Sequence, residues 1–95
     1  MGQSSFFYVI AYDIADDKRR KKIHNLLCGY CMWTQYSLFE GHLSDKEQIA
    51  LEAKLRKIVD EQHDSVRFYP LCAADVDNVI TIGSEPPQEE KEFIV

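Results

Sequence analysis

The sequence predicts an α+β sandwich in which two helices cover one face of a largely antiparallel sheet. Strand-like and helix-like segments follow one another in the order strand, helix, strand, helix, strand. The 95 residues match the size of one domain, and 45% apolar and 28% charged residues are typical of a folded chain. Because a domain of this size buries only about 60 to 65% of its unfolded surface, we expect it to dimerise.

The first strand and the first helix have clear boundaries. Phe6 to Tyr12 is an unbroken apolar, β-branched and aromatic run, as expected for a central strand, and it ends at Asp13. Apolar residues then recur at helical spacing, with Asp16 or Asp17 available as an amino-terminal cap. The spacing predicts a helix over about 16–28.

Aromatic and β-branched residues return between Met32 and Leu43. Leu38 and Phe39 are adjacent apolar residues, which breaks the alternation of a regular strand, so we expect a bend or bulge near Ser37. The stretch is therefore either one bent strand or two short strands.

The second helix carries the strongest start signal in the chain. Ser44 and Glu47 form a capping box, and apolar residues at helical spacing continue to about Asp60. A short alternating strand follows over 66–69, and Pro70 is expected to close it.

The carboxyl-terminal part combines one more strand with a tail. Asn78 to Ile82 has the pattern of a short strand. We therefore divide the chain into a domain over 1–83 and an acidic tail over 84–95. The tail ends in Phe93, Ile94 and Val95, which we expect to dock on the partner subunit of a dimer.

A run of five cations makes a nucleic-acid partner possible despite the net charge of −5. The tail holds four glutamates and one lysine, and the remaining 83 residues hold 12 acids and 10 bases. Local field decides nucleic-acid binding, and cations at the positive end of a helix dipole favour an anionic partner such as phosphate. A solvated helix start is the alternative. The run consists of Lys18, Arg19, Arg20, Lys21 and Lys22.

Asp13 is the candidate metal ligand, because it lies where an apolar strand gives way to a polar loop. A residue that starts a turn or caps the helix is the alternative. One carboxylate is a poor magnesium site, but in a two-fold dimer two copies of Asp13 could share one ion.

No apolar stretch approaches the ~20 residues of a membrane span, and the amino terminus does not resemble a signal peptide. We therefore expect a cytoplasmic protein with reduced thiols. Cys28 and Cys31 form a CxxC at the wrong end of a helix for redox chemistry, so they and Cys72 are interpreted as structural thiols.

Several rings are candidates for contact with nucleic acid. His24 lies on the helix with the basic run and is a possible phosphate contact. Trp33, Tyr36 and Phe39 could stack on bases or belong to the core, because aromatic residues at strand spacing are common in cores.

Four blocks in order resemble one family closely: YVIAYDIADDKRRKKIHNLL, TQYSLFEGHL, DSVRFYPLC and ITIG. The chain is similar over residues 8–83 to the small CRISPR-associated adaptation protein, the nuclease-like partner of the CRISPR integrase. The resemblance implies a ferredoxin-like βαββαβ fold, a symmetric homodimer and a metal-dependent nuclease. It also favours two short strands over 32–43. Many members of the family act instead, or also, as a DNA scaffold for spacer integration.

The resemblance assigns roles to individual residues. Asp13 matches the metal aspartate shared across the dimer, Tyr12 precedes it as in the family, and Arg20 falls on a functionally implicated arginine. Lys22 stands at the next such position, and Trp33 replaces an arginine seen in several members. The aromatic of the QYSLFE block is Phe39.

The leading hypothesis is therefore a CRISPR-associated endonuclease that cuts RNA or DNA with Mg²⁺ or Mn²⁺ held by Asp13. Tyr12 and Arg20 are the other candidate catalytic residues. A non-catalytic DNA scaffold for the integrase and a plain interaction domain are the alternatives. The nucleic-acid contacts expected on this hypothesis are Lys18, Arg19, Arg20, Lys22 and Phe39.

Overall fold

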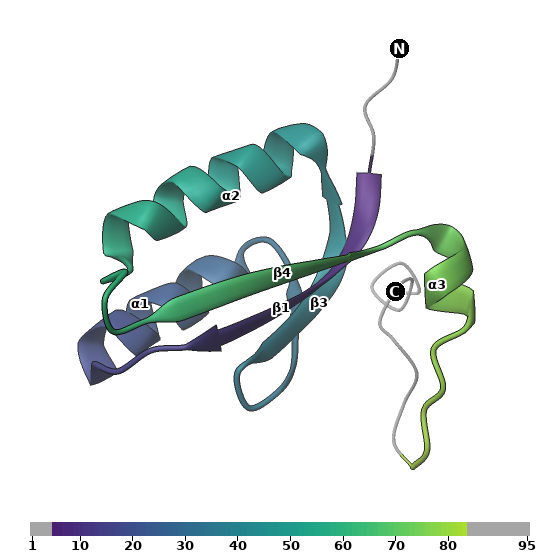
Figure 1. The fold of residues 1–95 in the computed structure, drawn as a ribbon, viewed down its shortest axis with the longest axis horizontal. Coiled ribbons are helices and arrows are strands. Elements are labelled where there is room, and N and C mark those ends of the chain that lie inside the picture. Colours follow the sequence, from purple (N-terminus) through teal and green to yellow (C-terminus); the bar gives the residue numbers. More distant parts are fainter. Residues whose placement is uncertain (1–4, 84–95) are drawn as a thin grey trace.

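The computed structural model describes residues 5–83, which form an α+β fold as predicted (Figure 1). The expected docking of the tail falls outside these residues. In chain order the elements are β1 (Ser5–Asp13), α1 (Asp17–Cys28), β2 (Met32–Gln35), β3 (Leu38–Ser44), α2 (Asp45–Ile58), β4 (Ser65–Leu71) and α3 (Ala73–Asp77).

The four strands form one sheet in the order β2-β3-β1-β4, and every neighbouring pair is antiparallel. With α1 and α2 between the strands, the order of elements is βαββαβ, the ferredoxin-like arrangement that the resemblance implied. The strand β1 lies inside the sheet, between β3 and β4, as expected for its apolar run.

The two long helices pack on one face of the sheet, where they form a single core with β1 and β3. Alternate side chains of β1 point into this core, because successive residues of a strand face opposite sides. Its fully buried members include Ile10, Ile23, Leu27, Phe39 and Leu51.

The other face of the sheet carries neither long helix. We call it the open face. The short helix α3 covers only one end of it, where Val76 and Phe7 are buried. By strand register, the open face includes Phe7, Val9, Ala11, Asp13, Leu38, Glu40, His42, Ser65, Arg67, Tyr69 and Leu71.

The caps and the break in the middle segment agree with the sequence. Asp16 accepts a hydrogen bond from the backbone of Arg19, and the Ser44 capping box is complete. The segment 32–43 forms two strands, as the resemblance favoured, and they are joined at Tyr36, whose φ is +47°. The helix α2 ends at Ile58, two residues earlier than expected.

Two expectations for the last third of the domain are wrong. Residues 78–82 form no strand, because no neighbouring strand in the described chain pairs with them, and the unpredicted helix α3 precedes them. Pro70 does not end β4, which continues to Leu71. β4 is an edge strand, so one side of its backbone has no neighbouring strand in the described sheet. A proline, which has no N–H to donate, is tolerated in such a strand.

Candidate nucleic-acid and metal site

Asp13 occupies the end of a rigid central strand and is exposed on the open face. Its partner in the neighbouring strand β4 is Ser65. Within residues 5–83 no side chain forms a hydrogen bond or ion pair with its carboxylate. Both oxygens are therefore accessible to a cation, to water or to another chain.

Arg20 is held next to the loop that follows Asp13. Its guanidinium donates to the Ile14 carbonyl at 2.9 Å and forms an ion pair with Asp17. The side chain keeps 44% of its surface exposed, so it remains accessible to a phosphate near the end of β1.

Arg19 is committed to a different contact. Its Nε and Nη2 donate to the Asp64 carboxylate at 2.8 and 3.2 Å, and the Asp64 side chain is fully buried. Asp64 also accepts from the backbone N–H groups of Ala15 and Asp60. Chiefly through the Arg19 hydrogen bonds, the pKa of Asp64 lies well below its usual range. Arg19 therefore orders the domain more than it offers donors to phosphate.

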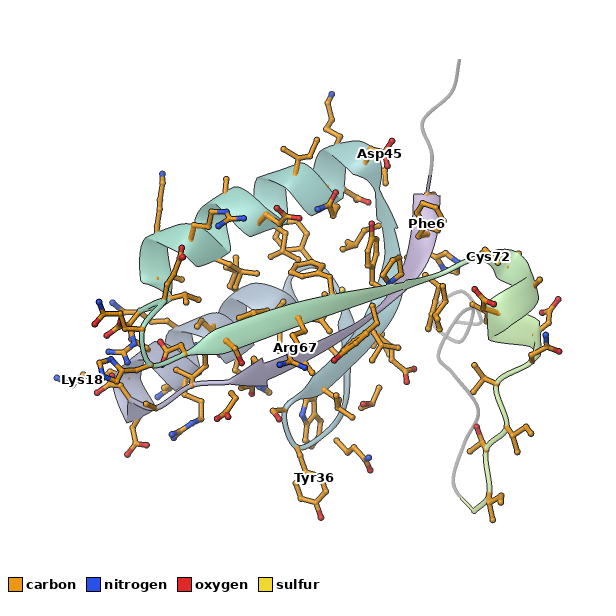
Figure 2. The ribbon with its side chains drawn as sticks, in the orientation of Figure 1. Phe6, Lys18, Tyr36, Asp45, Arg67 and Cys72 are labelled. Atoms are coloured by element: carbon orange, nitrogen blue, oxygen red, sulfur yellow. The ribbon has the colours of Figure 1, made fainter. Side chains whose placement is uncertain are left out.

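The remaining expected cations form no such ion pair with any residue that the structure describes. Lys18 and Lys22 are exposed and lie four positions apart, on one side of α1. Figure 2 shows Lys18 extending from the amino-terminal end of the helix into solvent. The structure thus separates the basic run into one anchoring arginine and a set of accessible cations.

Tyr12 points away from Asp13, into the core. Its hydroxyl forms a hydrogen bond with His24 Nδ1 at 3.0 Å, and burial raises the pKa of that hydroxyl. The structure therefore brings Tyr12 to His24 and separates it from the exposed carboxylate.

The expected nucleic-acid contact of Phe39 is wrong. Its ring is 0% exposed and lies beside Tyr12 and His24 in the core. It has no free face on which a base could stack, because β3 directs it toward α1. Residues at strand spacing cannot be assigned to a sheet face without knowledge of the register.

Arg67 is a cation that the sequence reasoning missed. It lies in β4 and pairs with Ala11 of β1, one step along the open face from the Asp13–Ser65 pair. It is exposed, and its guanidinium contacts the Tyr69 hydroxyl at 3.5 Å. The alternation of Val66 and Phe68 around it could have indicated that Arg67 faces away from the core.

The cysteines form no visible functional site within residues 5–83. Burial raises the pKa of the Cys31 thiol to about 12, which makes it a poor nucleophile, while Cys28 and Cys72 are exposed. In the described part of the chain no three potential metal ligands of the His, Cys, Asp or Glu type come together. A metal at Asp13 therefore needs ligands from a second chain, water or phosphate oxygens.

The helices of residues 5–83 are too short or too polar to cross a membrane. A groove lies between the end of α2 and β4, and its lining includes Leu55, Val59, Val66 and Phe68. It borders the free edge of β4, where backbone groups have no strand partner among the residues described.

Comparison with known proteins agrees with the geometry. Residues 6–79 match the family model described as CRISPR associated protein Cas2. The chain is 51% identical over 82 residues to a "CRISPR-associated endoribonuclease Cas2 3" of Synechocystis, covering 86% of this chain and 88% of that protein.

Two solved structures have the same fold. A hypothetical protein of Thermus thermophilus, TT1823, superposes with a TM-score of 0.78 at 35% identity and covers 90% of this chain and 100% of its own. A chain of a "Partial Cas6-RT-Cas1--Cas2 complex" superposes with a TM-score of 0.72 at 28% identity, over 85% and 88% of the two chains.

Proposed function

Because the chain belongs to the family of CRISPR associated protein Cas2, we propose that it is a dimeric, magnesium-dependent endonuclease of CRISPR adaptation. It hydrolyses phosphodiester bonds of RNA or DNA during spacer acquisition and so serves antiviral defence. The observation that carries this proposal is Asp13, an exposed carboxylate at the end of a rigid central strand, with Arg20 fixed beside the following loop.

In the proposed site the carboxylates bind the metal ion and the cationic side chains bind the phosphates. Two copies of Asp13, brought together by a two-fold axis, offer the oxygen ligands that Mg²⁺ or Mn²⁺ prefers. When bound, the ion supplies the Lewis acid for attack on phosphorus. Arg20 contacts the loop that follows Asp13, and Arg67 lies one step from Asp13 along the open face. Both orient the phosphate through charge-assisted hydrogen bonds. Lys18 and Lys22 hold the neighbouring backbone.

The open face supports the homodimer on which this site depends. Val9, Ala11, Leu38 and Tyr69 present apolar surface on the same face as Asp13, and neither α1 nor α2 covers them. Stacking the open faces of two copies buries this surface and brings the ends of the two β1 strands into one interface.

The free edge of β4 offers the dimer a second contact. Ile80 and Ile82 are 83% and 93% exposed in the segment that was expected to form a strand. That segment becomes a strand if it pairs with the β4 edge of the partner subunit. Such pairing would also fill the groove beside β4 with an apolar side chain.

The test is a cleavage assay on wild type and Asp13→Asn, with and without magnesium. We expect Asp13→Asn to lose cleavage by about 100-fold or more, because it removes a metal ligand at constant volume. Asp45→Asn is the matched control, since Asp45 follows the Ser44–Ser5 pair at the other end of β1. Unchanged cleavage by Asp13→Asn would overturn the shared-carboxylate site.

A second candidate function is a non-catalytic DNA scaffold for the CRISPR integrase. It is favoured by the similarity to a chain of a complex described as containing Cas1 and Cas2, together with the accessible cations of α1. In that case highly purified protein binds duplex DNA in a salt-sensitive way and assembles with the integrase, but shows no metal-dependent cleavage. The same assay therefore separates the two functions.

A further inference from the structure

The hairpin of β2 and β3 carries two exposed aromatic side chains that neither the core nor the proposed cleavage site uses. Trp33 is 53% exposed and Tyr36 is 85% exposed. Figure 2 shows Tyr36 at the tip of the hairpin, pointing away from the sheet. An aromatic ring that only fills the core is buried, as Phe39 of the same hairpin is. The exposure of Trp33 and Tyr36 therefore needs another explanation.

The indole of Trp33 is fixed in place. Its Nε1–H donates to the Tyr36 carbonyl at 2.7 Å, and its ring makes an edge contact with His24 at 6.1 Å between centroids. Tyr36 stands in the left-handed region with φ of +47°, which a turn of fixed geometry imposes. A ring that is already held and still half exposed loses little rotamer freedom when a flat partner stacks on it.

The charges next to Trp33 match a nucleic-acid strand. His24 lies on the side of α1 that also bears Arg20, one helical turn away, so the indole contacts the side of α1 that carries this cation. A groove of cations beside exposed aromatic rings is the usual arrangement for binding single strands, where phosphates meet the cations and bases stack on the rings.

We propose that Trp33, with Tyr36 beside it, is a stacking site for an unpaired base of a strand whose phosphates lie along α1. This rests on the proposed nucleic-acid function and assigns the β2–β3 hairpin the role of holding that base. A duplex keeps its bases inside the stack and cannot use the site without opening.

The chain has one tryptophan, so fluorescence excited at wavelengths that tyrosine does not absorb reports on Trp33 alone. The probes are a uridine oligonucleotide, an abasic strand of equal length and a blunt duplex at equal phosphate concentration, titrated without divalent metal. We expect the uridine strand to quench the fluorescence strongly and the other two to quench it weakly. Equal quenching by all three would overturn the proposal.

Variants distinguish stacking from charge. Trp33→Leu should weaken binding of the uridine strand by about 5- to 100-fold and leave the salt dependence unchanged, whereas Trp33→Phe should keep most of the affinity. Tyr36→Asn, which suits the positive φ, should cause a smaller loss. Unaltered affinity of Trp33→Leu, measured by filter binding, would refute stacking.

The same titration distinguishes base stacking from a protein contact at the hairpin and from the nuclease proposal. Quenching by the CRISPR integrase and by no nucleic acid would assign the hairpin to a protein contact and overturn the proposal. Because the assay contains no metal, base-dependent quenching without any cleavage in the magnesium assay would reject the nuclease and leave the stacking site standing. If Trp33→Leu keeps both its cleavage rate and its affinity unchanged, the stacking site is rejected and the nuclease proposal stands.

Discussion

At the residue scale, the buried carboxylate of Asp64 orders the segment after Asp13. It accepts hydrogen bonds from Ala15 at the start of the loop, from Asp60 after α2 and from Arg19 in α1. Two segments that are distant in the sequence, 15–19 and 60–64, are therefore joined through one side chain. A buried carboxylate that is fully hydrogen-bonded stabilises the fold only while it is ionised.

We expect this contact to make stability depend on pH. The pKa of Asp64 is lower in the folded state than in the unfolded chain, so its stabilisation is complete above the unfolded pKa of about 4 and decreases as pH falls below it. Asp64→Asn should melt below wild type at pH 7, and the difference in Tm should shrink toward pH 2. Glu61→Gln, an exposed site, should show no such pattern. A difference that stays constant with pH would contradict the role of ionisation.

At the scale of elements, α1 uses Arg19 to order the fold and leaves Lys18, Arg20 and Lys22 accessible to a ligand. Replacing Lys18, Arg20 and Lys22 by alanine should lower the slope of log affinity against log salt by roughly 2 to 3, from ~0.7 to 0.9 per lost phosphate contact. The control is the equal charge change on α2, which replaces Lys46, Arg56 and Lys57. Salt titrations that change equally in both triple variants would show that only net charge matters.

The same elements show what the sequence could predict. Spacing and caps located both long helices, and the adjacent Leu38 and Phe39 marked the break between β2 and β3. The segment 78–82 has strand alternation but finds no partner strand in one described chain, and pairing is a non-local property that a local pattern does not contain.

The candidate site divides in the same way. The place of Asp13 at the end of β1 could be predicted because a strand end is visible in the sequence. The burial of Phe39, the placement of Arg67 beside Asp13 and the ion pair of Arg19 with Asp64 depend on register and on contacts between distant segments. These required the folded chain, because a shift of one residue in register moves a side chain to the other face.

At the scale of the whole molecule, the proposed metal site at Asp13 requires assembly. Within residues 5–83 one chain would supply one carboxylate to the metal, and a domain of this size has little core of its own. A dimer interface on the open face would meet both needs, because it would enlarge the buried apolar surface and would bring a second Asp13 into the site. Dimer affinity and cleavage should therefore decline together.

Tyr69→Lys tests this coupling. Tyr69 is 46% exposed on the open face, so a lysine there leaves the core of one chain intact but places a charge in an apolar interface. Ile49→Lys is the matched control, because Ile49 is 65% exposed on α2, on the side of the sheet away from the open face. We expect Tyr69→Lys to weaken the dimer by about tenfold or more in sedimentation and to lower cleavage in the same proportion. Raising the concentration of Tyr69→Lys should restore the cleavage rate per chain, because mass action repopulates the dimer. A monomeric Tyr69→Lys with full activity would show that one Asp13 suffices and that the site is complete within a single chain.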